Sequence, residues 1–319
     1  MLTSLEICAG AGGQALGLEL AGFEHSALVE LDHGACQTLR FNRPTWNVVE
    51  GDVRAFSAIG HRGVDLLAGG VPCPPFSVAG KQLGPDDERD LFPEALRLVG
   101  EARPAAVMLE NVRGLLGPAF ADYRAQIDSK LSKLGYIAQW KLLHASDFGV
   151  PQLRPRVICV ALKPSAAAHF VWPVGNAHKT TVGEALLPLM ASNGWPGAAD
   201  WAEAACTVAP TLVGGSKKHG GPDLGPTRAK QAWRELGVDG MGIADAAPGP
   251  DFMGFPRLTV PMVARLQGFP SDWLIAGRKT VAYRQVGNAF PPPVAAAVAT
   301  QIAAALDAVA QRRVLRVAA

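Results

Sequence analysis

The first half of the chain alternates short aliphatic runs with segments that have helical periodicity. Such runs are typical of buried strands, and helices between them indicate parallel strand pairing. The expected strands are 5–8, 26–29, 48–49, 64–68, 106–109, 137–143 and 157–162, and the expected helices are 15–21, 93–102, 123–134, 257–267 and 294–312. We therefore predict an α/β fold with helices on both faces of one sheet.

This alternation fails between residues 166 and 256, where Gly, Pro and Trp are frequent and apolar periodicity is weak. Helical periodicity then returns, and the last expected helix carries Val294, Val298 and Ile302 on one face. We predict a first domain over 1–165, a smaller irregular domain over 166–256, and a segment over 257–319 that returns to the first domain.

Composition narrows the class of protein. The 319 residues are 49% hydrophobic and 18% charged, without a run that approaches the roughly 18 apolar residues of a membrane helix. The five cysteines are odd in number and lack CxxC pairs, so neither a disulfide framework nor a metal site is indicated. We expect a cytoplasmic protein with reduced thiols and no membrane partner. A net charge of +2 is too small to indicate a polyanion partner without local clustering.

A glycine-rich turn, Gly10-Ala11-Gly12-Gly13, follows the first expected strand and opens a helix. Glycines let a backbone turn tightly against a ligand, and a helix N-terminus favours negative groups. Glu30 ends the second strand and Asp52 follows the third. Because ligands of open α/β sheets bind beyond the carboxyl ends of the strands, this set predicts an adenosine-bearing cofactor, either NAD or S-adenosylmethionine.

Cys73 follows the fourth expected strand and stands between Pro72 and Pro74. Proline fixes its own φ and restricts the residue before it, so the backbone around the thiol is set before a substrate arrives. A buried structural cysteine is the alternative interpretation. The placement favours a nucleophile.

Glu110 follows the fifth expected strand, so its carboxylate faces the same crevice as Cys73. Further on, Gln152, Arg154 and Arg156 alternate with other residues on an extended segment and point to one side. A surface strand with basic residues is the alternative.

The ordered motifs resemble those of the bacterial cytosine-C5 DNA methyltransferases. They are the glycine loop, Pro72-Cys73-Pro74-Pro75-Phe76-Ser77, Glu110-Asn111-Val112, Gln152-x-Arg154-x-Arg156, Arg257-Leu258-Thr259 leading into Leu266-Gln267-Gly268-Phe269-Pro270, and Gly287-Asn288-Ala289. The resemblance implies a Rossmann-like, S-adenosylmethionine-dependent sheet as the catalytic domain. It also implies that 166–256 is the target-recognition domain, and that 257–319 completes the catalytic domain.

The resemblance implies a mechanism as well. An enzyme of this family flips the target cytosine out of double-stranded DNA, and the Cys73 thiolate adds to ring carbon 6. Glu110, with a raised pKa, would donate to ring nitrogen 3 and contact the exocyclic amine. Arg156 would bind the cytosine O2, Arg154 would help orient Glu110 or the backbone near the nucleophile, and Asn111 would brace the strand end.

The remaining site residues follow from the same match. Asn288 and the C-terminal helix would complete the cofactor pocket. A mobile loop would contact DNA through Ser77, Lys81, Gln82 and Arg89, and the basic stretch 216–235 would supply Lys217, Lys218, Arg228 and Arg234. We expect a monomer, and the resemblance leaves open a separate cognate restriction endonuclease.

Three alternatives remain. A tRNA cytosine-C5 methyltransferase would share every catalytic motif, and Cys206-Thr207-Val208 only partly matches the Cys-Phe-Thr element of that group. An NAD-dependent oxidoreductase would explain the glycine loop but neither the Pro-Cys-Pro nor the Gln-x-Arg-x-Arg segment. An inactive DNA-binding homologue is disfavoured by the intact Cys73, Glu110 and Arg156.

Overall fold

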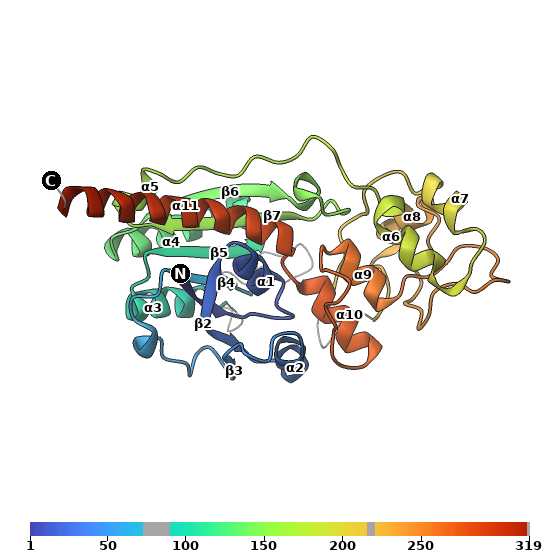
Figure 1. The fold of residues 1–319 in the computed structure, drawn as a ribbon, viewed down its shortest axis with the longest axis horizontal. Helices are drawn as coiled ribbons and strands as arrows, with labels where there is room; N and C mark the ends of the chain where they lie inside the picture. Colours follow the sequence, from blue (N-terminus) through green and yellow to red (C-terminus); the bar gives the residue numbers. More distant parts are fainter. Residues whose placement is uncertain (73–89, 216–220, 318–319) are drawn as a thin grey trace.

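The computed structural model describes residues 1–72, 90–215 and 221–317. In these residues a seven-stranded sheet runs in the order β3-β2-β1-β4-β5-β7-β6 (Figure 1). Its strands are β1 (Leu2–Ile7), β2 (Phe23–Glu30), β3 (Val48–Glu50), β4 (Leu66–Gly70), β5 (Ala106–Val112), β6 (Ile137–His144) and β7 (Pro155–Leu162). The first five strands pair in parallel, whereas β7 is antiparallel to both β5 and β6.

The sheet confirms the predicted α/β class and every expected strand, with shifted ends. β5 extends beyond the predicted 106–109 and includes Glu110, so this acid is a strand residue rather than a loop residue. In the sheet, β2 and β3 lie on one side of β1, whereas β4 and β5, which come later in the chain, lie on the other side. The carboxyl ends of β1 and β4 therefore form the switch point where such sheets bind ligands.

The helices include each one that periodicity predicted. They are α1 (Gly13–Leu20), α2 (His33–Asn42), α3 (Phe92–Ala102), α4 (Ala121–Lys133), α5 (Pro164–Ala167), α6 (Val182–Met190), α7 (Ala198–Ala204), α8 (Thr227–Glu235), α9 (Val260–Leu266), α10 (Lys279–Asn288) and α11 (Pro292–Val317). The sequence did not reveal α2, α10 or the helices of the middle region. In α8 only Trp233 is buried, so this helix has no apolar stripe for periodicity to detect.

Alternating strand residues build a core on each face of the sheet. In β4, Leu67 faces the cluster that includes α3 and α4, whereas Leu66 and Ala68 face the cluster that includes α1 and α11. This alternation follows from the period of two along a strand. Figure 1 shows α11 lying along the sheet beside α1, with the C-terminus far from α6, α7 and α8.

A further hydrophobic cluster joins the middle region to the segments that return. Val182 and Trp233 of the middle region pack there with Met262 of α9 and Val286 of α10. Phe170, by contrast, packs with β7 and α11. The domain boundaries at 165/166 and 256/257 stay predictions.

The segment Lys279–Arg312 is long and apolar enough, by composition, to cross a membrane. Its α11 part presents Val294, Val298 and Ile302 to the core, where each is at most 1% exposed. These are the residues that periodicity placed on one face. Packing on the sheet accounts for this apolar face of the helix.

The crossing of α1 and α11 depends on Gly17. A Cβ atom at this position would collide with Ala295 and lie 2.7 Å from the Pro292 carbonyl oxygen. We expect Gly17→Ala to lower the free energy of unfolding by about 1–3 kcal/mol, because the added methyl group overpacks the interface. Gly100→Ala is the matched control: it also lies in a helix, but its nearest contact is Leu134 Cδ2 at 3.7 Å. Urea denaturation should show the control to be neutral or stabilised. Equal loss in both variants would contradict this packing argument.

Candidate active site

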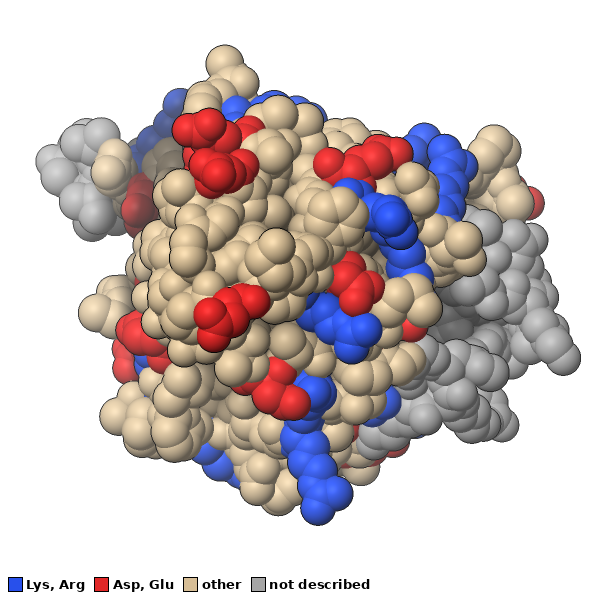
Figure 2. All heavy atoms as spheres, turned by 90° about the vertical axis from the view of Figure 1, so that its right-hand side faces the viewer, with Lys and Arg blue, Asp and Glu red and all other residues tan. Residues whose placement is uncertain are grey.

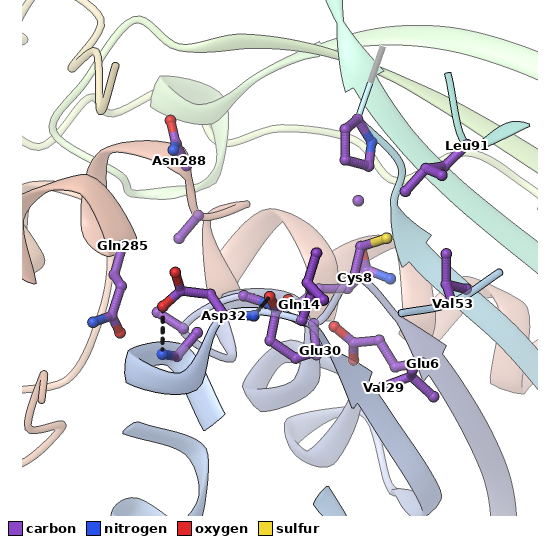
Figure 3. A pocket seen from close by; sticks show the side chains of 18 of the residues that line it. Glu6, Cys8, Gln14, Val29, Glu30, Asp32, Val53, Leu91, Gln285 and Asn288 are labelled. Carbon is purple, nitrogen blue, oxygen red and sulfur yellow. Dashed lines mark hydrogen bonds between the residues drawn. The ribbon is translucent and has the colours of Figure 1, made fainter. Parts of the chain in front are cut away.

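A cavity of about 340 Å³ lies at the carboxyl ends of β1, β2 and β4, and α10 borders it (Figure 3). Of the predicted site residues that the structure describes, five line it: Gly10, Glu30, Asp52, Glu110 and Asn288. The structure thus brings residues far apart in sequence to one cavity at the switch point.

Gly10 and Glu30 are joined directly. The Gly10 N–H donates a hydrogen bond of 2.7 Å to one carboxylate oxygen of Glu30, and the Asp32 N–H donates one of 2.7 Å to the other. Gly10 has a φ of 55°, a conformation that favours glycine. These bonds fix the Glu30 carboxylate at the cavity wall.

The other two predicted glycines serve packing between protein segments. A Cβ on Gly12 would lie 2.7 Å from Leu39 Cδ2, and one on Gly13 would collide with the Phe290 carbonyl. Neither residue lines the cavity. Direct contact of Gly12 and Gly13 with a cofactor stays a prediction.

Asp52 lines the same cavity. Its carboxylate accepts the Arg54 backbone N–H at 2.9 Å and pairs with the Arg54 guanidinium at 3.1 Å. The backbone hydrogen bond is the main cause that lowers the pKa of Asp52. Asp52 is therefore an ionised acceptor at neutral pH.

Sequence reasoning missed several polar residues of the cavity, among them Glu6 and Gln14. Both are buried, and none of their side-chain oxygen and nitrogen atoms has a hydrogen-bond partner among the described residues. Burial, reinforced by the nearby Glu30 charge, raises the pKa of Glu6 well above its usual value. A charged residue inside the aliphatic run of the first strand was the available signal.

Cys8 also lines the cavity, and Figure 3 shows it together with Glu6 and Gln14. Its φ of 53° is unusual for a residue with a side chain. Burial raises the pKa of the thiol, so Cys8 is neutral. Strained backbone of this kind clusters at functional sites.

Glu110 and Arg156 form a buried ion pair of 2.7 Å between the carboxylate and the guanidinium Nε. The register of β5 and β7 sets this pair, because Arg156 lies opposite Val112 and Glu110 lies two residues away on the same face. Burial raises the pKa of Glu110, although the charges of Arg156 and Arg154 oppose that shift. The direction agrees with the expected proton-donating role.

Asn111 braces the neighbouring strand end. Its Nδ2 donates a hydrogen bond of 2.9 Å to the Val71 carbonyl, and its Oδ1 accepts the Val112 N–H at 2.8 Å. Pro72, the next residue along, lines the cavity. Cys73 itself lies outside the described residues.

Arg154 makes different contacts from those we predicted. Fully buried, it donates hydrogen bonds of 2.9 Å to the carbonyls of Leu212, Gly287 and Ala289, rather than to Glu110. Its Gln152 neighbour accepts the Leu212 N–H at 2.8 Å. Alternation along this segment therefore does not bring all three polar residues to Glu110. Of Gln152, Arg154 and Arg156, only Arg156 pairs with Glu110.

The predicted DNA-contacting residues divide into two groups. Arg228 is exposed on α8, and Cζ of Arg234 on the same helix lies 5.6 Å from the centroid of the Phe255 ring. Figure 2 views the end of the molecule that includes α6, α7 and α8, where basic and acidic side chains are interspersed. The others lie outside the described residues: Ser77, Lys81, Gln82, Arg89, Lys217 and Lys218.

An open α/β sheet with a polar cavity at its switch point, next to a buried acid–guanidinium pair, is typical of an enzyme that holds a nucleoside-type cofactor beside its substrate. The chain belongs to the family of C-5 cytosine-specific DNA methylases, whose model matches residues 2–304.

Individual relatives agree with this assignment. The chain is 59% identical over 312 residues to the Type II methyltransferase M.NaeI of Lentzea aerocolonigenes, covering 96% of this chain and 76% of the relative. It is also 59% identical over 308 residues to the Type II methyltransferase M.NgoMIV of Neisseria gonorrhoeae, covering 95% of this chain and 98% of that protein. The solved structure of Spodoptera frugiperda DNMT2 superposes with a TM-score of 0.65 at 17% identity, over 95% of this chain and 99% of that one. That likeness supports the fold.

The unpartnered Glu6 gives a testable pH dependence. Because burial raises its folded-state pKa above the unfolded value, the folded protein binds more protons between the two pKa values, and stability falls as pH rises through that window. Glu6→Gln removes the titrating group. In the absence of cofactor, we expect the variant to gain stability relative to the wild type as the pH is raised from about 5 to about 9. Urea denaturation across this range measures the difference.

Glu24→Gln is the control, since Glu24 is exposed on the adjacent strand β2. Measured over the same pH range, it gives the effect of removing an exposed carboxylate from the same sheet. If the stability difference between Glu6→Gln and the wild type does not change with pH, the pKa of the Glu6 carboxyl is not raised and the prediction is wrong.

Proposed function

We propose that this enzyme methylates carbon 5 of a flipped-out cytosine in a specific double-stranded DNA sequence. Family membership supports the reaction type. The observation that carries the assignment within the site is the buried Glu110–Arg156 pair at the border of the cavity. This pair offers a protonatable acid and a guanidinium to one planar ring, which suits the N3 and O2 atoms of cytosine.

The Type II naming of the 59% identical relatives supports a role in restriction–modification. In that role the partner is double-stranded DNA, methylated at a fixed sequence. A cognate restriction endonuclease that acts separately, a monomeric state and a cytoplasmic location are further parts of the proposal.

The cavity residues fit S-adenosylmethionine. The ligand carries an ammonium group and a sulfonium, and both suit a cavity whose acids include Glu6, Glu30 and Asp52. The unpartnered atoms of Glu6 and Gln14 need such polar partners, because buried polar groups without hydrogen bonds are costly. Glu30 and Asp52 would hold the ribose and adenine ends, and Asn288 would border the opposite wall. When bound, S-adenosylmethionine supplies an electrophilic methyl group.

Cys73 is the proposed nucleophile. Its thiolate adds to cytosine carbon 6, which makes carbon 5 nucleophilic, and carbon 5 is then methylated. Loss of the carbon 5 proton and cleavage of the sulfur–carbon bond release the product. Pro72 precedes Cys73 in the chain and lines the cavity. The carbonyl of its neighbour Val71 accepts a hydrogen bond from Asn111, which holds this part of the chain.

Glu110 and Arg156 act on the cytosine ring. A protonated Glu110 donates to nitrogen 3 and offsets the negative charge that develops as sulfur adds to carbon 6. The raised pKa caused by burial favours that protonated form. Arg156, held at 2.7 Å from Glu110, donates to O2 and keeps the acid oriented.

The recognition residues remain part of the proposal. Arg228 and Arg234 on α8 would read bases or bind phosphates, and Ser77, Lys81, Gln82, Arg89, Lys217 and Lys218 would contact the DNA. The salt pair between Lys230 and Asp223, at 2.8 Å, reduces the free positive charge of this stretch.

The alternatives receive less support. A tRNA substrate is disfavoured by the DNA methylase family and by the Type II naming of the relatives. NAD would leave Glu110 and Arg156 without a function. An inactive homologue has no need of a buried acid with a raised pKa beside a guanidinium.

The nucleophile assignment predicts a covalent trap. Duplex DNA with 5-fluorocytosine at the target position should form a stable adduct with the enzyme and S-adenosylmethionine, because fluorine cannot leave as a proton. Cys73→Ser should form none. Cys206→Ser is the control, since Cys206 is exposed and should leave adduct formation unchanged. Denaturing electrophoresis measures the adduct, and a trapped Cys73→Ser protein would make the assignment wrong.

The cofactor assignment predicts selective loss of binding. Glu30→Ala should weaken S-adenosylmethionine affinity more than about tenfold, because charge-assisted hydrogen bonds contribute about 1.5–3 kcal/mol. Glu50→Ala is the control: Glu50 ends the adjacent strand but pairs with His33 and Arg40 outside the cavity. Calorimetric titration decides. Equal affinity in both variants, or tighter binding of NAD by the wild type, would contradict the assignment.

A further inference from the structure

Residues 212–215, which we call the strap, cross the end of α10 in direct backbone contact. A Cβ atom on Gly287 of α10 would lie 2.5 Å from Gly214 Cα and 2.6 Å from Gly214 N. A Cβ on Gly214 would in turn lie 2.7 Å from the Arg284 carbonyl oxygen. Only glycine on both sides permits this approach.

Polar side chains fix the strap along its length. Gln152 accepts the Leu212 N–H at 2.8 Å, and Arg154 donates to the Leu212 carbonyl at 2.9 Å. At the other end, Asn288 Nδ2 donates to the Gly215 carbonyl at 3.3 Å. Hydrogen bonds therefore connect the strap at one end to Gln152 and Arg154, beside the sheet, and at the other end to Asn288, at the border of the cavity.

Arg154 also holds the turn that carries Asn288. One of its terminal nitrogens donates to the carbonyls of Gly287 and Ala289, each at 2.9 Å. These two residues flank Asn288, which lines the cavity. A single buried guanidinium thus fixes the strap and the cavity border at once.

We propose that the strap is a positioning element through which the middle region sets Asn288 against the cofactor. Gly214 and Arg154 are then positioning residues for S-adenosylmethionine, although neither lines the cavity. This inference rests on the proposed function, because the ligand of the cavity is assigned there. By linkage, the cofactor that holds Asn288 also stabilises the strap, so cofactor binding and target recognition influence each other equally.

Gly214→Ala tests the proposal without changing a cavity residue. The new methyl group would lie 2.5 Å from Asn288 Oδ1 and must displace this side chain. We expect the KM for S-adenosylmethionine to rise about fivefold or more, with kcat at saturating cofactor within about twofold of the wild type. Gly221→Ala is the matched control, because nothing lies within 4 Å of its added Cβ. Equal KM values for the two variants would overturn the proposal.

A double-mutant cycle tests whether Gly214→Ala changes S-adenosylmethionine affinity by displacing Asn288. If Gly214→Ala acts through Asn288, the substitution should lose most of its effect on S-adenosylmethionine affinity in an Asn288→Ala background. Fully additive losses, measured by calorimetric titration, would show that the strap acts on the protein elsewhere and would refute the role of Asn288.

Arg154→Lys provides a second variant should Gly214→Ala fail to fold. Lysine keeps the charge but loses the planar fork that contacts three carbonyls. We expect its KM for S-adenosylmethionine to rise while its kcat is retained, whereas a direct role in cytosine chemistry would lower kcat. Wild-type protein that binds no S-adenosylmethionine would refute the proposed function. Wild-type binding with unchanged KM in both strap variants would refute this inference alone.

Discussion

The antiparallel pairing of β5 with β7 is the constraint on which the candidate site depends. Its register sets Val112 opposite Arg156 and so brings the guanidinium to Glu110, two residues away on the same face. A shift by one residue would turn the two side chains to opposite faces of the sheet. The relative position of Glu110 and Arg156 is therefore fixed by backbone hydrogen bonds within a buried sheet. A sheet holds side chains more rigidly than a loop does.

Beside this paired acid, the cavity contains an unpaired one. Glu110 is buried but has Arg156, whereas Glu6 is buried with no described partner. Natural proteins retain such a group when a ligand compensates it, because the unbound state otherwise carries its desolvation cost. In the proposed function, cofactor binding removes this cost, and the stability of the protein would then depend on cofactor occupancy.

Segments that lie far apart in the sequence also pack together, and this packing links the parts of the molecule. Residues after 256 contact both of the other parts of the chain: Met262 packs with Val182 and Trp233 of the middle region, and Ile302 packs under the sheet. Arg154 lies where these parts meet, and its hydrogen bonds reach two of them. The cavity, the middle region and the sheet are consequently not independent units of function.

The sequence by itself determined the strands of the sheet, most of the helices that connect them, and the placement of Glu30, Asp52 and Glu110 at or near strand ends. These follow from local periodicity and from the rule that parallel strands end at one edge, so no distant contact was needed to predict them. Only the tertiary structure decided what Arg154 contacts, because its acceptors are carbonyls more than 50 residues away, which no spacing pattern encodes. It likewise revealed Glu6 as a cavity residue, since burial without a partner depends on every segment packed around the carboxylate.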